Sequence, residues 1–114
     1  MNEVLFLGCQ AGPVTSGRPV ILGCPLDITS TYRRGAADAP RAIRVASDSI
    51  ETYSPLLDDD LTDAVFSDAG DIAMEPQQLE EALGRIEGNV SGVVSRGGVP
   101  LLIGGEHTIT LPAV

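Results

Sequence analysis

The sequence predicts an α/β protein in which parallel strands form a sheet between two layers of helices. Three short apolar runs, within residues 18–27, 63–72 and 99–103, alternate with two longer segments that carry apolar residues at helical spacing. Bulky residues are consecutive in the first and last runs, as expected when helices cover both faces of a parallel sheet. With right-handed crossovers, this order builds a three-layer α/β/α arrangement. We expect the 114 residues to form one domain, residues 1–114.

The first half of the chain contains one clear strand and one helix. Residues 3–9, EVLFLGC, fit a short strand or a packed turn, and residues 18–27, RPVILGCPLD, fit a buried strand. After a loop, a helix is predicted over residues 39–53, because Pro40 falls in its first turn, where the missing N–H of proline costs little. The side chains expected along its buried face are those of Ile43, Ala46 or Ser47, Ile50 and Tyr53.

The second half repeats this pattern. The strand within residues 63–72 is expected to be short and apolar and to end where Asp68, Gly70 and Asp71 turn the chain. A helix follows within residues 75–98, and residues 99–103 form the last buried strand. The helix stripe consists of Leu79, Leu83, Ile86, Val90 and Val93, and its glycines, Gly84, Gly88 and Gly92, could mark a face packed close to the sheet.

Composition and charge exclude several classes of protein. A hydrophobic fraction of 43 % with 20 % charged residues is typical of a folded globular chain. The net charge of −9 disfavours nucleic acid as a partner, and part of the excess lies in residues 56–63, which are expected to form an exposed acidic loop. No apolar run approaches the ~20 residues that cross a bilayer, so we expect a cytoplasmic protein. Cys9 and Cys24 are expected to be reduced, partly buried thiols.

The segment LLIGGEHTIT, residues 101–110, holds the only histidine, His107, directly after the last predicted strand. Ligands of open α/β sheets bind at the carboxyl ends of strands, so His107 is placed to ligate Mn, Fe, Ni or Zn, with Glu106 as an acceptor that orients it. Taken alone, the segment also fits a structural histidine. A third interpretation is a phosphate at a helix that begins near Gly104–Gly105, although the spacing matches neither GxGxxG nor GxxxxGK[ST].

Three blocks in order resemble the ureohydrolases, the family of arginase, agmatinase and formimidoylglutamase. LIGGEHTIT, residues 102–110, resembles the first metal motif of that family, GG[DE]HS, and FSDAGDI, residues 66–72, resembles its D-x-G-D strand end. Residues 21–44, ILGCPLDITSTYRRGAADAPRAIR, resemble its early G-x-P-x-D, Arg-Gly-Ala and Gly-Pro-x-x-Ile-Arg segments. The chain departs from the pattern at Arg34, Ala39 and Thr108, where proline, glycine and serine are common, and Glu106 in place of aspartate favours agmatinase-like members.

The resemblance implies a manganese-dependent hydrolase with an arginase-like fold, in which two Mn²⁺ ions share a hydroxide that attacks a guanidinium carbon and releases urea and an amine. It implies that His107 ligates one ion and that Glu106 supports it. The remaining ligands of the family come from later D-x-H-x-D and D-x-D blocks, which these 114 residues lack. We therefore expect the chain to be the N-terminal part of such an enzyme, inactive alone, with an open sheet edge and an uncovered apolar face.

Other polar residues have weaker assignments. Asp68 and Asp71, in the D-x-G-D block, are interpreted as structural rather than as metal ligands. Asp27, Arg33 and Arg34 could line the mouth of the site or a subunit contact, but an internal ion pair is favoured.

The substrate and the partners are expectations of the same kind. The acidic composition favours cationic agmatine over anionic formimidoylglutamate, while arginine, guanidinobutyrate and guanidinopropionate stay open. A homo-oligomer, trimer or hexamer, is expected from the resemblance. The alternative from a different class is a non-catalytic α/β module that binds an anion or a protein partner.

Overall fold

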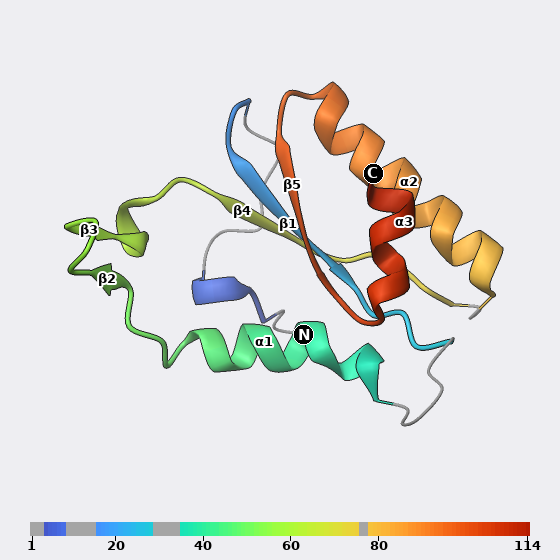
Figure 1. The fold of residues 1–114 in the computed structure, drawn as a ribbon, viewed down its shortest axis with the longest axis horizontal. Helices are drawn as coiled ribbons and strands as arrows, with labels where there is room; N and C mark the ends of the chain where they lie inside the picture. Colours follow the sequence, from blue (N-terminus) through green and yellow to red (C-terminus); the bar gives the residue numbers. More distant parts are fainter. Residues whose placement is uncertain (1–3, 9–15, 29–34, 76–77) are drawn as a thin grey trace.

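The structure, a computed structural model, describes residues 4–8, 16–28, 35–75 and 78–114 and has a three-stranded parallel sheet as its centre (Figure 1). The strands are β1 (Pro19–Cys24), β4 (Ser67–Asp71) and β5 (Val99–Gly104), in the order β4-β1-β5. β1 is the middle strand and pairs with β5 from Pro19↔Val99 to Cys24↔Gly104. The predicted parallel α/β sheet is therefore confirmed.

The helices between the strands lie on opposite sides of this sheet. α1 (Ala39–Ser47) lies on the path from β1 to β4, and α2 (Leu79–Ser95) joins β4 to β5 across the middle strand. These two crossovers run in opposite directions along the sheet, and right-handed crossovers of opposite direction place their helices on opposite faces. In Figure 1, α2 and the short α3 (Thr110–Ala113) stand together on one side of the strands, and α1 lies on another.

The main core lies between the sheet and α2. α2 presents the stripe that its apolar spacing predicts, since Ile86, Val90 and Val93 are buried and Leu79 and Leu83 pack against them. From the middle strand, Val20, Leu22 and Cys24 face this helix, and the core is completed by Leu26, Ile72, Met74, Ala82 and Ile109.

The glycines of α2 do not mark a close approach to the sheet. A Cβ built at Gly84, Gly88 or Gly92 would meet no atom within 4 Å. That interpretation is therefore wrong, because the three glycines lie away from the buried stripe. Among the described residues, no helix has the length and apolar character that a membrane span requires.

The first helix differs from its prediction. α1 ends at Ser47 instead of continuing to residue 53. Of the residues expected on its buried face, Ser47 is buried, whereas Ile43, Ile50 and Tyr53 are exposed. The face that α1 buries carries Pro40, Arg44 and Ser47. The physical reason is that Arg44 finds carboxylate partners on β4, so its charge is satisfied inside the protein.

The β4 strand also differs from its prediction. The apolar residues 64–66 precede the strand, and Asp68, Gly70 and Asp71 lie within it rather than in a turn after it. Asp68 and Gly70 alternate with exposed Ala69 and Asp71. The strand holds polar residues because their partners lie on α1, which local hydropathy does not show.

Two smaller segments complete the fold. Residues 6–8 form a 3-10 turn, η1 (Phe6–Gly8), so the packed-turn alternative holds there rather than a strand. The acidic segment is exposed as predicted, but it is ordered as an antiparallel hairpin of β2 (Tyr53–Ser54) and β3 (Asp59–Asp60), followed by the 3-10 turn η3 (Leu61–Asp63).

Candidate functional site

The candidate site lies where β1 and β5 end side by side. Cys24 and Gly104, the last residues of these strands, are in register. The chain then leaves β1 towards α1 and leaves β5 towards α3, which packs beside α2 on the other face. Neighbouring strands whose connections leave to opposite faces create a crevice at their carboxyl ends, the usual ligand position in open α/β sheets.

Two glycines let the chain turn sharply at the end of β5. Gly105 has a φ of 63°, a conformation that disfavours other residues, and a Cβ there would lie 2.1 Å from the carbonyl oxygen of Cys24. A Cβ at Gly104 would lie 2.3 Å from Cδ1 of buried Ile109. Gly105 is therefore required by its positive φ and by close packing against the loop after β1, whereas Gly104 makes room for the side chain of Ile109.

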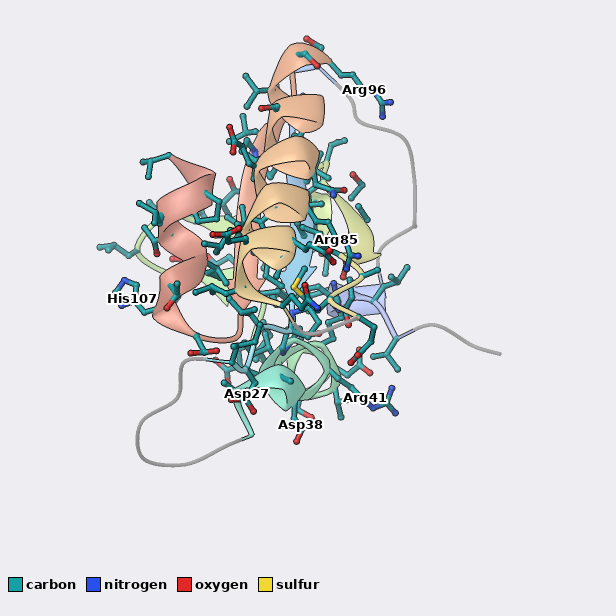
Figure 2. The ribbon with its side chains drawn as sticks, turned by 90° about the vertical axis from the view of Figure 1, so that its right-hand side faces the viewer. Asp27, Asp38, Arg41, Arg85, Arg96 and His107 are labelled. Carbon is teal, nitrogen blue, oxygen red and sulfur yellow. The ribbon has the colours of Figure 1, made fainter. Side chains whose placement is uncertain are left out.

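His107 begins the 3-10 turn η4 (His107–Ile109), just after the end of β5, and its side chain is exposed. In Figure 2 the imidazole projects away from the ribbon, and Asp27 lies on the same side of the molecule. The structure thus places His107 at the strand end, as predicted. Among the described residues, no group of three or more His, Cys, Asp or Glu side chains is close enough to hold a metal ion.

Glu106 is buried, and its backbone and side chain both contact the loop after β1. Its N–H donates to the carbonyl oxygen of Leu26 at 3.0 Å, and its carboxylate accepts from the N–H of Ile28. These two hydrogen bonds flank Asp27 on both sides. Sequence reasoning missed this contact, because it joins residues 78 positions apart and no short-range pattern reports it.

Asp27 also closes its own loop. Its Oδ2 accepts from the N–H of Gly35 at 2.7 Å, so the two ends of the segment between them are held together. Arg33 and Arg34 lie outside the described residues, and the ion pair expected for them stays a prediction.

Asp68 and Asp71 lie on β4 and bind Arg44, and Asp71, at the end of that strand, is in register with Gly23 of β1. Arg44 donates to both carboxylate oxygens of Asp68, at 2.8 Å and 2.9 Å, and to Asp71. Burial alone would raise the pKa of Asp68, but hydrogen bonds from Arg44 and from the N–H groups of Phe6 and Gly70 outweigh it, so this pKa lies below its ordinary value. These contacts give both aspartates a structural role, as partners of Arg44 rather than through the loop shaping and capping expected for them. The burial of Arg44 was not predicted, because its partners lie 24 and 27 residues away, on a strand that the local sequence of the helix does not indicate.

Cys24 is a buried thiol, as predicted, and Cys9 lies outside the described residues. Burial, together with the nearby charge of Asp71, raises the pKa of Cys24 to about 11. A thiol in this state is a poor nucleophile and a poor metal ligand at neutral pH.

The phosphate interpretation finds little support in this geometry. The segment after Gly105 is a three-residue 3-10 turn followed by the four-residue α3. Such a short helix has few aligned peptide dipoles to attract an anion.

Comparison with known proteins identifies relatives along most of the chain. The family model described as the arginase family matches residues 18–114. Agmatinase of Bacillus subtilis is 39 % identical over 95 residues, which are 83 % of this chain and 33 % of that protein. Guanidinobutyrase of Pseudomonas aeruginosa is 38 % identical over 92 residues, 80 % of this chain and 29 % of that one. The chain thus spans about a third of the length of the curated relatives it matches.

Solved structures show the same fold. The agmatine ureohydrolase of Thermoplasma volcanium superposes with a TM-score of 0.84 at 34 % identity, covering 99 % of this chain and 38 % of that one. A formiminoglutamase of Trypanosoma cruzi, solved with Mn²⁺, gives a TM-score of 0.76 at 30 % identity, covering 97 % and 39 %. The family model matches most of this chain, and the chain has the fold of these hydrolases. It therefore belongs to the arginase family.

Proposed function

We propose that this chain is the N-terminal part of an agmatinase-like ureohydrolase, a manganese-dependent enzyme that hydrolyses a guanidino compound to urea and an amine. One observation carries the proposal. His107, in the block that resembles the first metal motif of this family, is exposed on the turn that follows the end of β5. Matches to agmatinases and to a manganese-containing relative support the same chemistry.

The residues of the crevice fit a metal site in part. An exposed imidazole is a good ligand for Mn²⁺, and the rigid Gly104–Gly105 turn fixes where it stands. A bound divalent cation would lower the pKa of water enough to make a nucleophile at neutral pH, which a resonance-stabilised guanidinium requires. One histidine cannot hold two ions, so the proposal assigns the other ligands to residues beyond these 114.

Agmatine is the substrate that the comparisons and the charge favour. Several of the matched relatives are agmatinases, and a net charge of −9 attracts a cation more than an anion. Guanidinobutyrate and formimidoylglutamate are the nearest competitors, because relatives that act on them also match this chain.

The test is urea release by the complete gene product after loading with Mn²⁺. Agmatine, arginine, guanidinobutyrate and formimidoylglutamate are supplied separately, and we expect agmatine to give the highest kcat/KM. His107→Asn should lower kcat/KM by at least about 100-fold, since it removes a ligand, whereas Thr110→Ala, an exposed change three residues away, should leave it within about twofold. No urea from any guanidino compound would refute the amidinohydrolase assignment and favour formimidoyl chemistry.

The DNA after codon 114 gives an independent test of the same proposal. We expect it to encode a D-x-H-x-D block within a few dozen codons. If no frame encodes this block, the metal centre cannot be completed, and a non-catalytic α/β module becomes the better explanation.

The oligomeric state is a separate part of the proposal. The mass of the complete protein in solution should correspond to a trimer or hexamer.

A further inference from the structure

Glu106 has a role that its position beside His107 does not reveal. An acid next to a metal-binding histidine is expected to orient the imidazole by accepting its second N–H. In the structure the carboxylate of Glu106 accepts from the N–H of Ile28, on the loop after β1. This side chain therefore also contacts the loop that follows another strand, β1.

Three contacts join the two loops into one unit. The N–H of Glu106 donates to Leu26, its carboxylate accepts from Ile28, and Gly105 lies so close to the Cys24 carbonyl that no side chain fits between them. Glu106 and Leu26 are both buried, so water competes little for these hydrogen bonds. A carboxylate that accepts from a backbone N–H makes a stronger hydrogen bond than a neutral acceptor would.

From this geometry we propose that Glu106 is a positioning residue, which fixes the Leu26–Ile28 segment against the turn that carries His107. The two loops of the crevice then hold one relative position, and Asp27, flanked by the two hydrogen bonds, is kept at the same edge as the imidazole. That this contact supports metal binding at His107 rests on the proposed function, whereas the contact between the two loops does not.

Amide hydrogen exchange of Ile28, followed by NMR on the ¹⁵N-labelled protein, tests the contact directly. Glu106→Ala removes the acceptor, and we expect the Ile28 amide to exchange at least about tenfold faster. Glu106→Gln keeps a side-chain oxygen of the same reach and should restore protection to within about threefold. Glu80→Ala, an exposed acid at the start of α2, is the matched control and should leave Ile28 unchanged.

If Glu106→Ala does not fold, the chemical shift of the Ile28 amide in Glu106→Gln provides a second test of the contact. Glu106→Gln replaces the carboxylate that accepts this hydrogen bond by a neutral carboxamide. Outside residues 105–107, the backbone N–H whose chemical shift changes most should therefore be that of Ile28. The proposal is overturned if Ile28 does not shift in this variant, or if its exchange in a folded Glu106→Ala protein equals that of the unaltered chain.

Manganese binding by the complete gene product then tests the consequence. Glu106→Ala should raise the dissociation constant for Mn²⁺ by about tenfold, as loss of a supporting residue commonly does, and Glu106→Gln should stay within about twofold. Equal affinity in all three proteins would show that the contact does not position the metal ligand. If the unaltered protein releases no urea while Ile28 responds as expected, the proposed function fails and the contact stands.

Discussion

At the scale of single residues, two buried polar groups determine the geometry of this chain. Glu106 joins the ends of β1 and β5, and Arg44 joins α1 to β4. The position of His107 could be predicted, because a glycine pair after an apolar run marks a strand end. The partners of Glu106 and Arg44 could not, because they lie 78 and 24 residues away and depend on the assembled sheet.

Arg44→Met should strongly destabilise the protein. Arg44 is 3 % exposed and Asp68 is fully buried, so the substitution leaves a carboxylate without its cation. Removing one partner of a buried ion pair costs about 3–5 kcal/mol of unfolding free energy, which urea denaturation followed by circular dichroism measures. Arg41→Met is the control, since Arg41 is exposed on the same helix and should change stability by less than about 0.5 kcal/mol. Equal stabilities for the two variants would contradict this account of α1.

At the scale of elements, apolar periodicity predicts helices whose buried face is entirely apolar. It succeeds for α2, where four core positions, Ala82, Ile86, Val90 and Val93, repeat at helical spacing. It fails for most of α1, where Ser47 is buried as predicted but Arg44 shares that face and Ile43 is exposed. It fails for β4 for the same reason, since Asp68 is the partner of Arg44. Both errors come from one polar contact between two elements.

The exposed glycines of α2 allow a test at this scale. Gly84→Ala should stabilise the protein by about 0.5–1 kcal/mol, because alanine loses less backbone entropy in a helix and a Cβ at this position meets no atom within 4 Å. The matched change Gly105→Ala should instead destabilise it by about 2 kcal/mol, since the φ is positive and the new Cβ would meet the Cys24 carbonyl. The midpoints of thermal unfolding should move in opposite directions. A loss of stability in Gly84→Ala would indicate that the glycine face of α2 packs closely against another part of the protein, contrary to the structure.

At the scale of the whole molecule, the two faces of the sheet are covered unequally. α2 covers the face that carries Val20 and Leu22, whereas beside Ile21 on the other face the structure has a hollow of about 470 Å³. Val65, Val99 and Leu101 are about half exposed around that face, and β5 is an edge strand. The uncovered apolar face expected from the sequence is therefore present in the described residues.

This face should make the 114-residue chain self-associate. An apolar patch beside an open strand edge favours pairing between molecules, and a charge placed there opposes it. Leu101→Glu introduces that charge at a position 48 % exposed, so we expect sedimentation velocity at rising concentration to show less association than for the unaltered chain. Leu56→Glu makes the same chemical change on the exposed hairpin, where Leu56 is 93 % exposed and lies outside this face, and should leave association unchanged. If Leu56→Glu abolishes association and Leu101→Glu does not, the molecules associate through the hairpin rather than through the sheet face. The comparison is direct, because only the location of the added charge differs between the two variants.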